Sequence, residues 1–434
     1  IVTVLRGVRP YGEEPVDIVV ADGVITEITG AGRASDDSDV IDADGLVALP
    51  GFVDLHTHLR EPGREDAETI LTGSRAAALG GFTCVHAMAN TTPVADTAGV
   101  VEQVRNLGER AGLVDVRPVG AVTVGLGGVQ LAELGAMAHS AAQVRVFSDD
   151  GKCVHDAVIM RRALEYVKAF DGVIAQHAQE PRLTEHAQMN EGELSGRLGL
   201  AGWPAVAEEA IIARDVLLAQ HVGSRLHVCH VSTAGSVDVI RWAKARGIDV
   251  TAEVTPHHLL LTEDLVAGYD PVYKVNPPLR TADDVIALRA ALADGTIDAL
   301  ATDHAPHPHE DKDCEWAAAA MGMLGLETAL GVAIETMVES GLLDWRGLAD
   351  RMAVRPARIG RVRTQGHDLA VGAIANITVV DPTARRVITP DGLASKSRNT
   401  PYAGRELPGA VVHVLFAGTP TVRDGAVCWD GVVR

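Results

Sequence analysis

Short apolar runs alternate with amphipathic helical stretches through the middle of this chain. Three of the clearest helical patterns are Arg161 to Phe170, Ala205 to Ala219 and Ala282 to Ala293. A strand followed by a helix, repeated eight times over about 300 residues, favours an α/β protein built as a (β/α)8 TIM-like barrel. The expected strands lie near residues 52–57, 82–88, 115–122, 143–147, 173–177, 226–229, 249–253 and 298–301.

An open, doubly wound sheet is the competing architecture for such an alternation. Dinucleotide-binding sheets of that kind carry a glycine-rich loop that opens a helix directly after a strand. The stretch Gly125-Leu126-Gly127-Gly128 does not open a helix with the expected spacing. The barrel is therefore the preferred architecture.

The two ends of the chain have a different pattern, with short strand-like runs separated by turns. Near the start, Asp22-Gly23 lies between two apolar runs, which indicates a β-hairpin. Similar runs return after residue 375. We therefore expect a small β-sandwich-like domain formed by both termini, residues 1–47 and 366–434, beside a hydrolase barrel over residues 48–365.

Composition and charge narrow the class of protein. The chain has 434 residues, of which 47% are apolar and 3% aromatic. Its core must therefore be built mainly from aliphatic side chains, as in proteins with buried parallel strands. The net charge of −20 argues against a nucleic-acid partner and against an anionic membrane surface, because both require a basic surface.

The cysteines indicate a reducing compartment. There are five, an odd number, and they are scattered without a Cys-x-x-Cys pair, so no disulfide framework is expected. The chain has no run of 18 apolar residues, and its first residues have a strand pattern rather than that of a signal peptide. We therefore expect a cytoplasmic protein.

Side chains that can bind metal follow five of the eight expected strands. Parallel strands of a barrel present their carboxyl ends at one face, so these side chains should converge there. The two histidines of the first strand are at positions i and i+2 and project to the same side. Such a set can hold two zinc ions, which generate a hydroxide near neutral pH. The candidate ligands are His56, His58, the pair Asp149 and Asp150, His177, His230 and Asp303.

Two further polar residues lie beside these candidates. Arg60 comes two residues after His58 and can present a planar fork to a carboxylate. A surface ion pair with Glu61 or Glu65 is the alternative role for this side chain. Asn90 follows the second strand, where it could bind substrate or cap a local turn.

Taken together, the motifs resemble the type I dihydroorotases, which belong to the amidohydrolase superfamily of metal-dependent barrels. The resemblance covers almost the whole chain, and its motifs are long and occur in order. The matching segments are Asp54-Leu55-His56-Thr57-His58-Leu59-Arg60-Glu61-Pro62-Gly63, Asn90-Thr91, Phe147-Ser148-Asp149-Asp150-Gly151, His177, Val228-Cys229-His230, Thr255-Pro256-His257-His258, Asn276-Pro277-Pro278-Leu279-Arg280 and Ala301-Thr302-Asp303-His304-Ala305-Pro306-His307.

The resemblance implies a zinc-dependent enzyme that interconverts N-carbamoyl-L-aspartate and L-dihydroorotate, a step of pyrimidine biosynthesis. A hydroxide bridging the metals would be the nucleophile and Asp303 the general acid and base. The implied zinc ligands are His56, His58 and Asp303 for one ion, His177 and His230 for the other, and Asp150 as the bridge, with Asp149 as its alternative. The implied substrate contacts are Arg60, Asn90 and His307 for the carboxylate, and Asn276 and the backbone near Gly322 for the ring.

Two segments depart from the family pattern. Met88-Ala89-Asn90-Thr91 has alanine where the family commonly has proline, and Ala320-Met321-Gly322 replaces a common Pro-Phe-Gly. The second departure lies in residues 310–323, which we interpret as a mobile loop over the site. It bears on the ring contact at Gly322 and leaves the metal ligands unchanged.

Two other functions remain as alternatives. One is a cyclic amidase for dihydropyrimidines, hydantoins or allantoin, but those relatives use a bridging lysine at the end of the fourth strand, where this chain has Asp149 and Asp150. The other is an inactive homologue that serves as a scaffold for aspartate transcarbamoylase, although none of the expected ligands is missing. The expected partners are the small-molecule substrate and further copies of the chain in a homo-oligomer. A complex with aspartate transcarbamoylase is a further expected association, which an active enzyme could also form.

Overall fold

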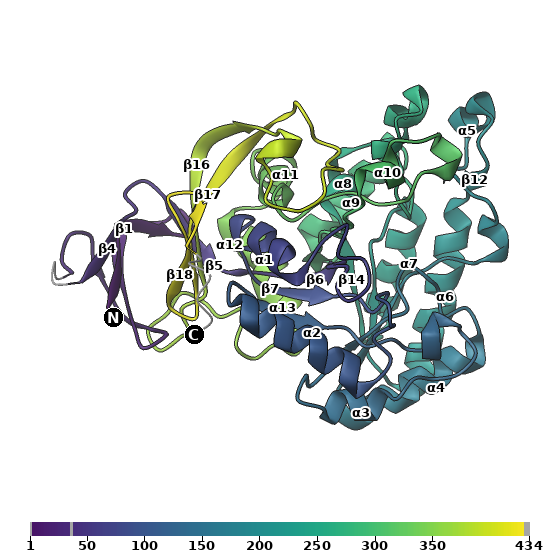
Figure 1. Cartoon of the computed structure of the whole chain (residues 1–434), viewed down its shortest axis with the longest axis horizontal. Helices are drawn as coiled ribbons and strands as arrows, with labels where there is room; N and C mark the ends of the chain where they lie inside the picture. The colour runs from purple at the N-terminus through teal and green to yellow at the C-terminus, as the bar shows by residue number, and fades with distance from the viewer. Residues whose placement is uncertain (1, 35–37, 429–434) are drawn as a thin grey trace.

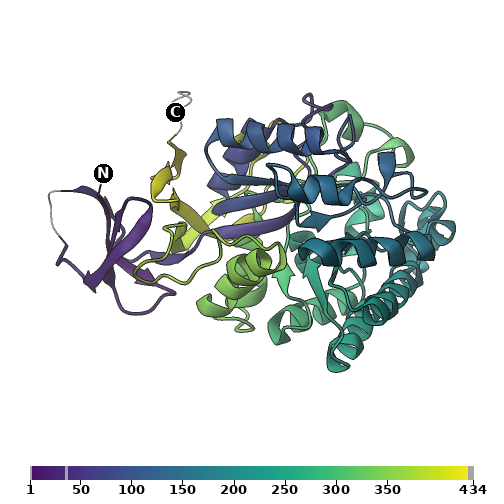
Figure 2. The ribbon, with the colours of Figure 1, turned by 90° about the horizontal axis from the view of Figure 1, so that it is seen from below.

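The structure is a computed structural model that describes residues 2–34 and 38–428. Its larger part is a barrel of eight parallel strands (Figures 1 and 2). Two parallel sheets form it, and isolated bridges between Gly120 and Phe147 and between Thr57 and His304 join the sheets at both edges. The strands are β6 (Phe52–Thr57), β7 (Phe82–Ala87), β8 (Asp115–Pro118), β9 (Val146–Phe147), β10 (Val173–Gln176), β13 (Leu226–Val228), β14 (Val250–Val254) and β15 (Ala299–Leu300).

A helix follows each barrel strand, so the alternation expected from the sequence is present. The helices cover the outer side of the barrel, with α2, α3 and α4 along one side in Figure 1. The eight are α1 (Ile70–Leu79), α2 (Ala98–Ala111), α3 (Leu134–His139), α4 (Ala157–Val167), α6 (Ala205–Val222), α7 (Ala234–Ala245), α9 (Ala282–Asp294) and α11 (Ala329–Ala333).

Polar caps and glycines decide where these helices begin and end. The sequence pattern predicted a helix from Arg161, but α4 starts at Ala157 because the Asp156 carboxylate accepts hydrogen bonds from the first backbone N–H groups. The helix predicted to end at Ala219 continues to Val222, where Gly223 adopts a left-handed conformation with φ of 71°. The apolar pattern thus located the helices, and local capping chemistry set their ends.

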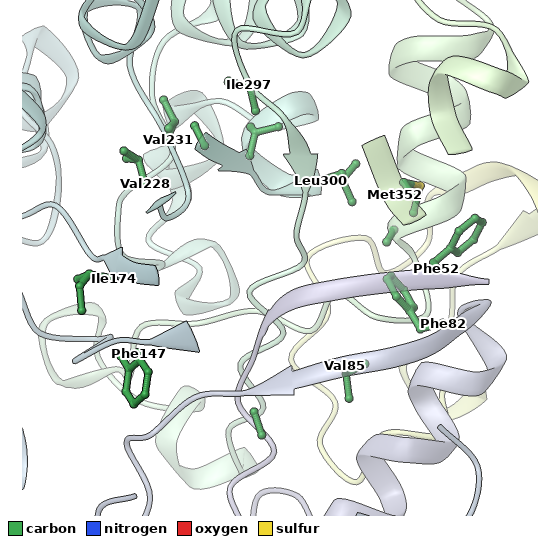
Figure 3. Close-up of a cluster of buried hydrophobic side chains, with 14 of the residues drawn as sticks. Phe52, Phe82, Val85, Phe147, Ile174, Val228, Val231, Ile297, Leu300 and Met352 are labelled. Atoms are coloured by element: carbon green, nitrogen blue, oxygen red, sulfur yellow. The ribbon is translucent and has the colours of Figure 1, made fainter. Parts of the chain in front are cut away.

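The main core lies between the barrel strands and the surrounding helices. Figure 3 shows Phe52, Val85 and Ile174 from the strands in one cluster with Met352 from a helical segment. All four side chains are fully or almost fully buried. Aliphatic residues dominate this cluster, as the low aromatic content predicted. None of the helices within the described ranges is long and apolar enough to cross a membrane.

The smaller part of the molecule combines strands from both ends of the chain (left in Figure 1). β5 pairs with β16 in antiparallel register, Val47 facing Val380, and side chains such as Ile18 and Ile377 share one core cluster. The strands are β1 (Thr3–Pro10), β2 (Val16–Ala21), β3 (Val24–Gly30), β4 (Asp39–Asp42), β5 (Val47–Pro50), β16 (Ile377–Val387), β17 (Glu406–Phe416), β18 (Thr419–Arg423) and β19 (Ala426–Val427).

The hairpin expected at Asp22-Gly23 joins β2 to β3, with Ala21 facing Val24. Asp22 and Gly23 both have positive φ, 51° and 81°, as a two-residue hairpin turn requires. The boundaries 1–47, 48–365 and 366–434 stay a prediction. Residues 429–434 of the last range, and residues 1 and 35–37 of the first, lie outside the described residues.

Candidate metal centre and substrate site

Four of the predicted ligands meet where the first, fourth and eighth strands end. His56 is in β6 and His58 just beyond it, while Asp303 follows β15. The Nε2 atoms of His56 and His58 lie 3.2 and 3.1 Å from Oδ1 of Asp303. Each also lies 3.2 Å from Oδ2 of Asp150. These four side chains are buried, and each offers a ligand atom within 4.8 Å of the others.

A second cluster shares Asp150 with the first. Its other carboxylate oxygen, Oδ1, lies 3.1 Å from Nδ1 of His177 and 3.1 Å from Nε2 of His230. Those two ring nitrogens are 2.9 Å apart. One oxygen of Asp150 thus faces each cluster, the arrangement that a carboxylate bridging two metal ions needs.

Asp149 has a different environment, although it is also buried. Its Oδ1 atom accepts hydrogen bonds from the backbone N–H groups of Val122 and Thr123, at 2.8 and 3.0 Å. Its Oδ2 atom accepts one from the Thr123 hydroxyl. These bonds use the Asp149 carboxylate to fix the loop after β8, and Asp149 belongs to neither cluster.

The donor set fits a divalent metal. Nε2 of His56 is buried and has no hydrogen-bond partner among the described residues, although two carboxylates lie 3.2 Å away. Burial opposes protonation of His56, but Asp150, Asp303 and Glu253 outweigh it and hold its pKa well above the usual value. Nitrogen and oxygen donors that face one point across a cluster of opposite charge are what zinc and similar ions bind.

Residues behind the ligands orient them, and sequence reasoning did not assign these roles. Oε2 of Glu253 lies 3.0 Å from Nδ1 of His56, and Oε1 lies 2.9 Å from Nε2 of His227. Oε1 of Gln179 lies 2.7 Å from Nε2 of His177. A buried acid within the apolar strand Val250–Val254 is the sequence signal that could have identified Glu253.

Asn90 also lies against a metal-ligand candidate. Its Oδ1 atom is 2.8 Å from Nδ1 of His58. A hydrogen bond there fixes which ring nitrogen of His58 carries the proton and leaves Nε2 free to face the carboxylates. The side-chain amide nitrogen of Asn90 is not used in this contact. The local-cap role is therefore not the one found, and the predicted substrate contact stays a prediction.

Arg60 and His307 lie next to each other beside the first cluster. The Arg60 Nε group donates to the carbonyl of Pro306 at 3.0 Å, and its Nη2 atom lies 3.4 Å from Nε2 of His307. Among the described residues no ion pair joins Arg60 to Glu61 or Glu65, whose carboxylates accept instead from the N–H groups of Ile70 and Gly63, at 2.7 and 2.9 Å. Burial, Arg60 and Lys312 lower the pKa of His307 to about 3, so this ring is neutral at physiological pH.

The predicted ring contacts are engaged with protein groups. Oδ1 of Asn276 accepts from Nε1 of Trp203 at 3.0 Å, and its Nδ2 donates to Oε1 of Gln179 at 3.0 Å. Gly322 has φ of 151°, and a Cβ there would lie 2.7 Å from Nε2 of His307. Its N–H donates to the carbonyl of Lys274. Asn276 is thus linked through Gln179 to His177, and only glycine fits beside His307.

Comparisons with known proteins agree with this geometry. Residues 45–236 match the family model for dihydro-orotase-like proteins. The dihydroorotase of Streptomyces coelicolor is 69% identical over 98% of this chain and 99% of its own length. The dihydroorotase of Mycobacterium tuberculosis is 59% identical over 98% and 99%. Among solved structures, an L-hydantoinase (dihydropyrimidinase) from Arthrobacter aurescens has a TM-score of 0.87 at 26% identity, covering 98% of this chain and 97% of its own.

Proposed function

Because the chain belongs to the dihydroorotase family, we propose that it catalyses the reversible conversion of N-carbamoyl-L-aspartate to L-dihydroorotate and water. The observation that carries this proposal is the pair of buried His/Asp clusters that share Asp150, with Arg60 beside them. A metal centre next to an arginine suits a cyclic amide that also carries a carboxylate.

The proposed centre contains two zinc ions. His56, His58 and Asp303 would hold one, His177 and His230 the other, and Asp150 both. Two such ions supply an activated water and polarise the reacting carbonyl. The remaining steps rest on the side chains of the protein.

Asp303 is proposed to move the proton. Burial opposes its ionisation, but the charges of His56 and His58 outweigh burial and hold the pKa of this carboxyl below its usual range. The group is therefore ionised at neutral pH and can accept a proton from the attacking water. It then returns that proton to the ring nitrogen as the amide bond breaks. In the reverse direction the same two transfers run in the opposite order.

Arg60, Asn90 and His307 are proposed to bind the substrate carboxylate. Arg60 supplies the charge, because burial lowers its pKa only to about 10. The neutral His307 can donate a hydrogen bond without adding a second cation. Asn276 and the backbone around Gly322 would place the ring, so that the reacting carbonyl faces the metal centre.

The L-hydantoinase likeness supports the fold and the general cyclic-amidase chemistry. The high identity to proteins named dihydroorotase favours the acidic substrate over hydantoins and dihydropyrimidines. A homo-oligomer, an association with aspartate transcarbamoylase and a cytoplasmic location belong to the same proposal. The five free cysteines are consistent with such a location.

The test is a direct assay of the zinc-loaded protein in both directions, followed by absorbance of dihydroorotate. We expect turnover with dihydroorotate and carbamoyl aspartate and none with hydantoin or dihydrouracil. Asp303→Asn should keep the fold and lose turnover. Absence of turnover in the metal-loaded wild type would overturn the proposal.

A further inference from the structure

Two lysines, Lys274 and Lys312, have buried side chains close to Gly322, one of the predicted substrate contacts. Their side chains are 3% and 9% exposed. Lysine is almost never buried to this degree unless a carboxylate pairs with it. Among the described residues, neither ammonium group forms an ion pair with a carboxylate.

Backbone carbonyls take the place of the missing carboxylates. An ammonium group has three N–H donors, and each of these lysines has three carbonyls within hydrogen-bond distance. Burial and the nearby charge of Lys274 lower the pKa of Lys312 to about 7. The Lys312 Nζ group donates to the carbonyls of Pro271, Lys274 and Ala320, at 2.9, 3.0 and 2.7 Å. The Lys274 Nζ group donates to the carbonyls of Trp316, Ala317 and Ala319, at 2.8, 3.4 and 2.9 Å.

The two sets of bonds interlock across one segment, residues 305–323, which we call the site segment. Lys312 is part of this segment, and its Nζ group donates to the carbonyl of Lys274, which lies outside the segment. The Nζ group of Lys274 in turn donates to carbonyls within the segment. The segment has little regular structure of its own, only α10 (His309–Lys312) and the single turn Trp316–Ala318. These six bonds therefore help to define its shape, together with bonds between its own backbone groups, such as the one from the Ala320 N–H to the Asp311 carbonyl at 2.9 Å.

The held backbone leads directly to the expected substrate contacts. The Lys274 carbonyl also accepts from the N–H of Gly322, at 2.9 Å. The neighbouring carbonyl of Met321 lies 3.0 Å from Nε2 of His307. Lys274 itself is two residues before Asn276 in the chain. One hydrogen-bonded unit thus includes His307, Gly322 and Lys274, and the chain continues from Lys274 directly to Asn276.

We propose that Lys274 and Lys312 are positioning residues for substrate binding, which hold the site segment so that His307 and Gly322 face the substrate. This inference rests on the proposed function. It assigns the lysines no contact with the reacting atoms and no part in binding metal. Loss of either ammonium group should loosen the segment and weaken substrate binding, while the metal centre and the proton transfer by Asp303 stay intact.

The test uses the zinc-loaded full chain with Lys312→Met and Lys274→Met. Lys168→Met is the matched control, because that exposed lysine also donates to a carbonyl, Val222, but lies outside the site segment. We expect KM for dihydroorotate to rise about tenfold in both site variants, with kcat changed much less, since binding rather than chemistry is lost. Lys312→Arg, which keeps several donors, should restore part of the lost affinity.

Amide hydrogen exchange of the substrate-free protein gives a second measurement that does not depend on turnover. Exchange within residues 309–322 should accelerate in the methionine variants and not in Lys168→Met. Unchanged exchange together with an unchanged KM would overturn the proposed positioning role of Lys274 and Lys312. A kcat that falls together with the zinc content would overturn it as well. Should a methionine variant fail to fold, Lys312→Gln, which keeps a shorter polar chain, is measured in its place. A wild type without activity would count against the proposed function instead.

Discussion

Glu253 and His56 form a buried pair, with Oε2 of Glu253 3.0 Å from Nδ1 of the ring whose Nε2 faces Asp150 and Asp303. The carboxylate fixes the tautomer in which Nε2 is free and raises its basicity as a ligand. The other oxygen of Glu253 is held by His227, so the carboxylate cannot turn away. The proposed metal centre would thus depend on a residue that lies behind one of its ligands.

Glu253→Gln should weaken metal binding about 10- to 100-fold, because the amide is a poorer acceptor for the His56 ring. Competition with a chelator measures this affinity. Asp17→Asn is the control, since Asp17 is also buried but accepts backbone N–H groups in the small β part. Equal zinc affinity in Glu253→Gln and wild type would contradict the orienting role.

Asp149 and Asp150 give a pair of matched variants. Asp150→Asn should lose metal and turnover, because it removes the carboxylate common to both clusters. Asp149→Asn should keep both metals and lose about 1–3 kcal/mol of stability, because the asparagine cannot satisfy all the N–H and O–H donors around it. Metal analysis and chemical denaturation separate the two effects. The opposite pattern would assign the bridge to Asp149.

Gly322→Ala should raise KM for dihydroorotate about tenfold, since the new methyl group displaces the His307 ring that it would otherwise meet at 2.7 Å. Gly341→Ala is the control. Gly341 also has positive φ, 77°, but no atom lies within 4 Å of a Cβ placed there. Steady-state kinetics on both variants then separate the clash from backbone strain. A normal KM in Gly322→Ala would show that His307 does not bind substrate.

His86 should make the protein less stable in acid. Burial lowers the pKa of the His86 ring to about 4 in the folded protein. Between pH 6.5 and 4 the ring is therefore neutral in the folded protein, whereas in the unfolded chain it takes up a proton near pH 6.5. Stability contributed by the neutral ring is therefore lost as pH falls from about 6.5 towards 4, by up to about 3 kcal/mol. Its Nδ1 atom lies 2.8 Å from the carbonyl of Asp54, a bond that asparagine can replace.

The measurement is the free energy of unfolding of His86→Asn and wild type between pH 4.5 and 7.5. The variant should lose less stability on acidification, so that the difference between the two proteins changes steadily across this range. Parallel curves would indicate that another group causes the acid sensitivity.

The sequence was sufficient to predict the barrel and the residues that form the two clusters, because both depend on local patterns. Apolar runs mark the strands, and ligand-type residues directly after them must meet at one face. Asp150 could not be separated from Asp149 in this way. The two are adjacent, and their different surroundings come from the loop after β8, which is distant in sequence.

The sequence did not predict the residues that orient the ligands or position the site segment, for a related reason. Gln179, Lys274 and Lys312 occur in stretches without a strong pattern, and their roles exist only through contacts with distant backbone or side chains. A lysine in a loop is usually exposed, so nothing in the sequence marks Lys312 as buried. Such roles follow from tertiary packing rather than from residue type.

The barrel closes where Thr57 meets His304, and Asp54 accepts a hydrogen bond from the Thr302 N–H across 248 residues of chain. His56 and His58 therefore gain Asp303 only after the chain has been synthesised as far as residue 303, 245 residues beyond His58. A nascent chain that ends before this point contains these histidines and Asp150 but not Asp303. The first cluster is thus completed only when the barrel closes, whereas Asp150, His177 and His230 of the second cluster all precede Asp303 in the chain.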